Sequence, residues 1–167
     1  MSHALCALVV AGQVDAARAE ALGLYAALAH GDVTVFPIDH YFSAYWAAVR
    51  GDRGELDLPA GILSESVTFP TEAVLRDLAR EVTRGGTPRF AVIQTEYFGG
   101  VGDQWAAAFE GEARVTPDGA TIDQALAALG VRATAAEDEF DVIGLGSLRG
   151  SPDHLQVYAA LCDELGV

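Results

Sequence analysis

The segment 90–109, FAVIQTEYFGGVGDQWAAAF, constrains the fold more than any other part of the chain, because it predicts two strands joined by a glycine turn. Side chains of 90–98 alternate between two faces that both begin apolar, which is typical of a central strand. The GGVG segment supplies the positive φ angles that tight turns need. The run 104–109 completes the hairpin, for which we expect a bulge, and 112–115 adds a third antiparallel strand.

Polar and aromatic side chains gather near the turn of this hairpin. Glu96, Tyr97, Asp103 and Gln104 are expected to cluster at its open end, with Trp105 beside them. A carboxylate at the end of a central strand, next to a flexible backbone, suits a ligand or a partner protein. The alternative is that the glycines serve only the turn, Glu96 is solvated, and Tyr97 and Trp105 pack in the core or at its rim.

Hydrophobic periodicity organises the rest of the chain into one domain, residues 1–167, with half of the residues hydrophobic. We expect an α+β fold, with a mostly antiparallel sheet of about five or six strands and helices packed on one face. Further strands are expected at 4–11, 33–38 and 62–69, with a strand or docking loop at 141–145. Helices are expected at 16–29, 40–49, 72–84, 122–129 and 152–165.

The chain is acidic, with a formal net charge of −14 and a pI near 4.4. This balance argues against binding to nucleic acid or to an anionic membrane, since both need a basic surface. It permits a basic protein partner, although acidity also serves plain solubility. All ten basic residues are arginine, and together with abundant Ala and Gly this indicates a GC-rich bacterial genome.

Neither metal nor cofactor is expected from the sequence. Cys6 and Cys162 lie at opposite ends of the chain, outside any CxxC or Cys/His metal spacing, and we expect free, buried thiols. The first apolar run lacks a preceding positive region, and no run approaches the roughly 20 apolar residues of a membrane-spanning helix. We therefore expect a cytoplasmic protein.

Two further patterns have open interpretations. The acidic run 137–141, which contains Asp138 and Glu139, is able to bind a divalent cation or an arginine-rich partner, or it is a solvated turn. His40 follows Asp39 and is a candidate polarised base, although adjacent residues in a helix do not face each other. The aromatic residues that follow at helical spacing are more typical of a core than of a binding platform.

Three segments and one arginine carry a resemblance. TEYFGGVGDQWAAAF, TIDQALAALGV and DEFDVIGLG, followed by Arg149, resemble in this order the C-terminal half of a family of small bacterial proteins without an assigned activity. The resemblance covers 90–149 and implies a bacterial cytoplasmic protein. Proteins of this kind are sometimes immunity partners of toxins or components of phage defence. It transfers no functional residue to this chain.

Two functions follow from these patterns. The first is an immunity- or inhibitor-like module that binds a basic protein, with these contact residues: Glu96, Tyr97, Gln104, Trp105, Asp138 and Glu139. The alternative is a small enzyme with Glu96 as general acid or base, assisted by Asp103 or His40, which requires Glu96 to be at least partly desolvated. Apolar strands at a sheet edge also allow a homodimer.

Overall fold

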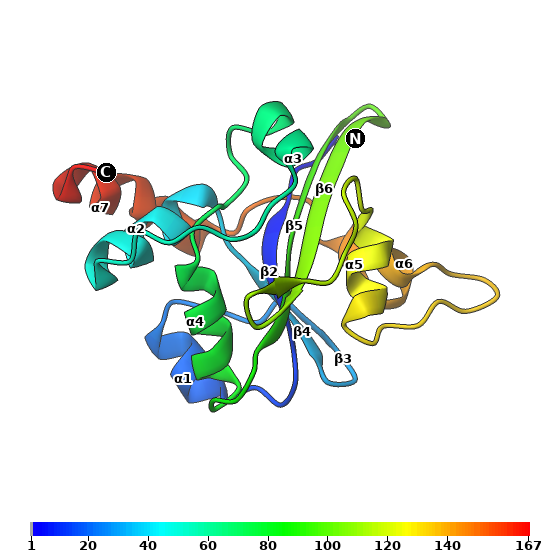
Figure 1. Cartoon of the computed structure of the whole chain (residues 1–167). Coiled ribbons are helices and arrows are strands. Elements are labelled where there is room, and N and C mark those ends of the chain that lie inside the picture. The colour runs from blue at the N-terminus through cyan, green and yellow to red at the C-terminus, as the bar shows by residue number, and fades with distance from the viewer. Residues whose placement is uncertain (1) are drawn as a thin grey trace.

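A seven-stranded sheet forms the centre of the computed structural model, which describes residues 2–167 (Figure 1). Every strand pair is antiparallel, in the order β3-β4-β2-β5-β6-β7, with β1 also paired to β5. The predicted α+β class is confirmed. The strands are β1 (Ser2–His3), β2 (Cys6–Ala11), β3 (Leu28–His30), β4 (Val33–Pro37), β5 (Arg89–Phe98), β6 (Val101–Glu110) and β7 (Ala113–Arg114).

The longest strand pair is the predicted β5–β6 hairpin. Its register is continuous from the pair Arg89–Glu110 to the pair Phe98–Val101, so the expected bulge is absent from this hairpin. Gly99 and Gly100, with φ angles of 61° and 81°, form a two-residue turn instead. Two consecutive positive φ angles match the right-handed twist of the strands, and an extra residue is therefore unnecessary.

The helices cover both faces of the sheet, which corrects the expectation that they pack on one face (Figure 1). The physical reason is that β2 and β5 are apolar on both faces. Leu8 and Phe90 belong to one buried core, and Val9 and Ile93 belong to the other. Each apolar face needs its own cover. The first core packs against α1, α2, α4 and α7, and the second packs against α5 and the segment that follows it.

Three helices begin where capping residues predict, but several helices are shorter than expected, and the last one, α7, begins at Val157 after a 3₁₀ turn instead of at 152. Asp15, Asp39 and Thr121 accept hydrogen bonds from backbone N–H groups at their helix starts, as predicted. The first helix ends early because Gly23 takes a left-handed conformation, with φ 75°. The helices are α1 (Ala16–Ala21), α2 (His40–Arg50), α3 (Ala60–Glu65), α4 (Val74–Val82), α5 (Ile122–Ala128), α6 (Glu139–Val142) and α7 (Val157–Leu165), with 3₁₀ turns at Leu145–Ser147 and Asp153–Gln156.

The expected strand 62–69 and the segment 141–145, expected as a strand or docking loop, are both partly helical. Part of 62–69 lies in α3, which begins directly after Pro59, a residue favoured at helix starts. Residues 141–145 form the end of α6 and the start of a 3₁₀ turn, because the Asp138 carboxylate caps α6 by accepting the Asp141 N–H. Within residues 2–167, no helix is long and apolar enough to cross a membrane.

Candidate functional site

The C-terminal end of β5 divides its polar side chains between the two faces of the sheet. Glu96 lies directly opposite Asp103 on one face, while on the other face the Gln104 amide Nε2 donates a hydrogen bond to the Tyr97 hydroxyl at 3.1 Å. Successive side chains of a strand point to opposite faces, so the cluster expected at the open end of the hairpin is split in two. The two halves border different cavities.

The cavity on the second face, here called the hairpin pocket, has a volume of about 350 Å³. It lies between the β5–β6 hairpin and the segments that carry α5 and α6. Three of the expected binding residues, Tyr97, Gln104 and Asp138, line it together. The other lining residues are His3, Thr95, Asp123, Phe140, Gly146 and Arg149.

His3 fixes one wall of the hairpin pocket and is only 8% exposed. One ring nitrogen, Nδ1, lies 2.6 Å from the Thr95 hydroxyl, and the other, Nε2, lies 3.1 Å from the Leu145 carbonyl oxygen. The Thr95 hydroxyl also accepts the Leu5 N–H at 3.1 Å. These bonds tie β1, β5 and the 3₁₀ turn together. Since buried polar groups that are fully hydrogen-bonded rigidify their surroundings, this wall is preorganised.

Two carboxylates face the hairpin pocket, and each uses one oxygen for structure. Asp123 Oδ1 accepts the Phe140 N–H at 2.8 Å, and Asp138 Oδ1 accepts the Asp141 N–H at 3.0 Å. In the described part of the chain no hydrogen bond engages the second oxygen of either aspartate. Burial raises the pKa of Asp123, whereas the hydrogen bond from the Phe140 N–H lowers it. Repulsion from the carboxylates of Asp138, Glu139 and Asp141 raises it further. A bound cation would relieve that repulsion.

Arg149 brings a positive charge to the same pocket. Its main-chain carbonyl accepts the Ala4 N–H at 3.0 Å, which anchors the residue beside β1. Among residues 2–167, no acidic side chain forms an ion pair with its exposed guanidinium group. The residues that line the pocket therefore include two aspartates and one arginine without an ion-pair partner among residues 2–167.

The cavity on the first face of the sheet measures about 280 Å³ and brings His40 and Glu96 together. Asp103 does not line it, so the three catalytic candidates are not assembled at one place. Glu96 is exposed, and the desolvation that a general acid or base needs at this position is missing. Burial raises the pKa of Cys6 at the floor, which keeps that thiol protonated and unreactive.

Trp105 and Glu139 lie outside the hairpin pocket. Trp105 is 7% exposed and packs in the first core, where its indole Nε1 donates to Glu65 Oε2 at 3.2 Å. Glu139 is half-buried in the first turn of α6, and its charge adds to the repulsion that raises the pKa of Asp123. Across the described chain, no group of three or more His, Cys, Asp or Glu side chains is placed to hold a metal ion.

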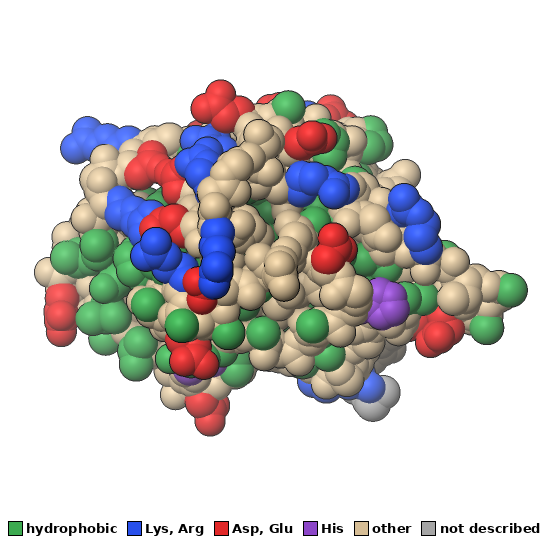
Figure 2. Space-filling model, turned by 90° about the horizontal axis from the view of Figure 1, so that it is seen from below, with side chains coloured by type: hydrophobic (Ala, Val, Ile, Leu, Met, Phe, Trp, Pro, Cys, Tyr) green, Lys and Arg blue, Asp and Glu red, His purple; other side chains and the backbone are tan. Residues whose placement is uncertain are grey.

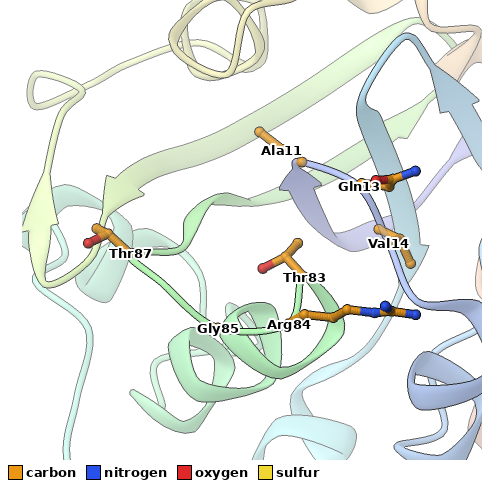
Figure 3. A pocket seen from close by; sticks show the side chains of 8 residues that line it. Ala11, Gln13, Val14, Thr83, Arg84, Gly85 and Thr87 are labelled. Carbon is orange, nitrogen blue, oxygen red and sulfur yellow. The ribbon is translucent and has the colours of Figure 1, made fainter.

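A third hollow, of about 430 Å³, lies between the loop after β2 and the loop after α4 (Figure 3). Arg84 is the titratable residue among those that line it, and its guanidinium group already donates to Asp15 Oδ2 at 3.2 Å. Figure 2 views this end of the molecule from below and shows Arg side chains interspersed with acidic ones. Because its charge is already paired, this hollow is less suited to a charged ligand than the hairpin pocket.

Comparison of the chain with protein-family models, with curated proteins and with solved structures finds no match. The site residues that sequence reasoning missed are His3, Asp123 and Arg149. Asp123 and Arg149 come from separate segments of the chain, and only the fold brings them to one pocket with Tyr97. His3 reaches the site only through the pairing of β1 with β5.

Proposed function

We propose that the protein is an acidic binding module that holds a cationic side chain of a basic protein partner in the hairpin pocket. The observation that carries this proposal is the pair of aspartates, Asp123 and Asp138, each with one carboxylate oxygen that no hydrogen bond engages within residues 2–167, in a cavity that Tyr97 and Phe140 also line. We place this activity in the bacterial cytoplasm, in the manner of an immunity- or inhibitor-like protein.

Three physical effects favour a cation in the hairpin pocket. The net charge of −14 steers a basic partner toward the molecule and speeds its encounter. A guanidinium or ammonium group lowers the repulsion among the carboxylates around Asp123. The aromatic rings of Tyr97 and Phe140 line the same cavity, and such rings attract cations and pack against the aliphatic stems of Arg and Lys.

The test is calorimetric titration with a short peptide that contains one internal arginine and has blocked ends, compared with the same peptide carrying glutamine. The arginine peptide should bind and the glutamine peptide should not. Asp123→Asn keeps the oxygen that accepts the Phe140 N–H but removes the charge, and we expect an affinity loss of about tenfold, the range for a charged hydrogen bond.

The matched control is Asp163→Asn, which removes the same charge from an exposed position on α7. It should leave the affinity within about a factor of two, because exposed distant charges are screened. Equal affinities for both peptides, or equal losses in both variants, would contradict the proposal. Affinity capture from the host lysate at low and moderate salt then identifies the partner as a stoichiometric basic protein that salt releases.

A second candidate function is a small enzyme that uses the cavity on the first face, where a bound substrate would have to supply the desolvation that the exposed Glu96 lacks. The observation in its favour is that His40 and Glu96 line the same cavity of about 280 Å³. The experiment is a thermal-shift screen of ligands and metal ions against the wild-type protein and the Glu96→Gln variant. A compound that stabilises only the wild type supports a ligand site at this cavity that depends on Glu96, and a screen without such a compound counts against it.

A further inference from the structure

The hairpin pocket contains charges of both signs, which a site for a cation alone does not need. Arg149 lines the cavity together with Asp123 and Asp138. A guanidinium group repels an incoming Arg or Lys side chain, and such a repulsive element reduces affinity unless the ligand also carries an anionic group. The ligand that fits this pocket therefore has one positive and one negative end.

Arg149 also differs from the arginines that serve ion pairs in the fold. Those that pair with acidic side chains in the described chain are Arg50, Arg76, Arg80, Arg84 and Arg114. Arg149 shares a cavity with Asp138 and yet forms no ion pair with it in the described structure. Its main chain is held by the Ala4 N–H, so the residue is anchored while its guanidinium group stays available.

A C-terminal arginine or lysine residue of a polypeptide carries both charges in one residue. Its α-carboxylate matches the guanidinium group of Arg149, because guanidinium binds carboxylate with two parallel hydrogen bonds. Its side-chain cation matches the free oxygens of Asp123 and Asp138. The cavity of about 350 Å³ lies at the lower end of the usual range for ligand pockets, which suits a single residue better than a folded surface.

We propose that the hairpin pocket recognises the free carboxyl end of a basic protein partner, with Arg149 receiving the terminal carboxylate and Asp123 and Asp138 receiving the cationic side chain of the last residue. Capture of a C-terminal carboxylate is a recurring mode of peptide recognition. This inference rests on the proposed function and adds the part of the partner that enters the pocket. The proposed ligand is the end of a polypeptide chain, and the titration described next distinguishes it from a free amino acid.

The experiment compares a short peptide that ends in arginine with a free carboxylate, the same peptide with an amidated end, and free L-arginine, all by calorimetric titration. For the wild-type protein, amidation should weaken binding about three- to tenfold, the range of a partly exposed charged hydrogen bond. In Arg149→Gln the two peptides should bind equally, at the affinity of the amidated peptide. Free L-arginine should bind more weakly than the acid peptide.

The matched control is Arg53→Gln, which removes the same charge from an exposed loop and should retain the full preference for the free carboxylate. Equal binding of the acid and amidated peptides to the wild type would overturn this inference and leave the proposed function standing. Failure of every arginine peptide to bind would overturn the proposed function itself. L-arginine binding as tightly as the acid peptide would overturn the assignment to a chain end.

Discussion

At the scale of single residues, Asp123 lines the proposed binding pocket and also affects the stability of the protein. Burial raises the pKa of its carboxyl group above the ordinary value for aspartate, and the surrounding carboxylates raise it further. A carboxyl group whose pKa is raised on folding contributes stability that is present below its unfolded pKa. That contribution is lost as the pH rises through the folded pKa. At neutral pH the Asp123 charge therefore opposes folding.

We predict that Asp123→Asn is more stable than the wild type at pH 7 and that the difference disappears near pH 3. The asparagine oxygen keeps the hydrogen bond from Phe140, and the gain should stay below about 1 kcal/mol because the carboxyl group is partly solvated. Urea unfolding of both proteins between pH 3 and pH 7 measures the difference in their free energies of unfolding. A variant that is less stable at pH 7 would show that Asp123 supports the fold rather than the site.

The residues of the site could be predicted from the sequence only in part. Tyr97, Gln104 and Asp138 were identified by their place near the turn or in the acidic run, and they do line one pocket. Glu96 was grouped with them because it is adjacent in sequence, but strand alternation places it on the opposite face. His3 is 92 residues away from its partner Thr95, and no local pattern reports such a contact.

At the scale of elements, Gly102 determines how closely the two strands of the hairpin approach near the turn. A Cβ atom added there would lie 1.8 Å from the main-chain oxygen of Glu96. Because that neighbour is backbone, the strands must separate to admit a side chain. We predict that Gly102→Ala destabilises the protein by about 1–3 kcal/mol, as overpacking does, and disturbs Tyr97, its cross-strand partner in the pocket.

The matched variant for this prediction is Gly61→Ala, because Gly61 lies in α3 with no atom within 4 Å of an added Cβ. An alanine in a helix is favoured over glycine by up to about 1 kcal/mol, so this variant should be neutral or more stable. Chemical denaturation of the three proteins provides the comparison. Similar stabilities for Gly102→Ala and the wild type would contradict this prediction, because they would show that β5 and β6 separate near the turn with little loss of stability.

The elements were predicted best where a local signal is strong. The hairpin and the helix starts at Asp39 and Thr121 follow from glycine pairs and capping residues. The sequence analysis expects helices on one face of the sheet only. Strand β2 is buried at every position, however, which is typical of a strand with both faces covered. The sequence predicts a strand at 62–69 because a short apolar run does not distinguish a strand from a helix, and the structure places part of this segment in α3.

At the scale of the whole molecule, the charge of −14 opposes folding and favours the proposed binding of a basic partner. Folding brings the acidic groups closer together, so their mutual repulsion opposes the compact state, and salt screens that repulsion. Binding to a basic partner depends on attraction, which salt screens as well. Ion pairs such as Arg84–Asp15 favour the folded state, but exposed pairs contribute little each.

We therefore predict that raising sodium chloride from about 0.02 M to about 0.3 M, which shortens the Debye length several-fold, raises the midpoint of thermal unfolding by a few degrees. The same change should weaken binding of the arginine-ended peptide about tenfold. Salt should therefore raise the unfolding midpoint and lower the affinity. A salt-induced loss of structure would instead lower both the midpoint and the affinity. A midpoint that falls with salt would show that the surface ion pairs outweigh the net repulsion. Binding that does not respond to salt would remove electrostatic attraction as the basis of recognition.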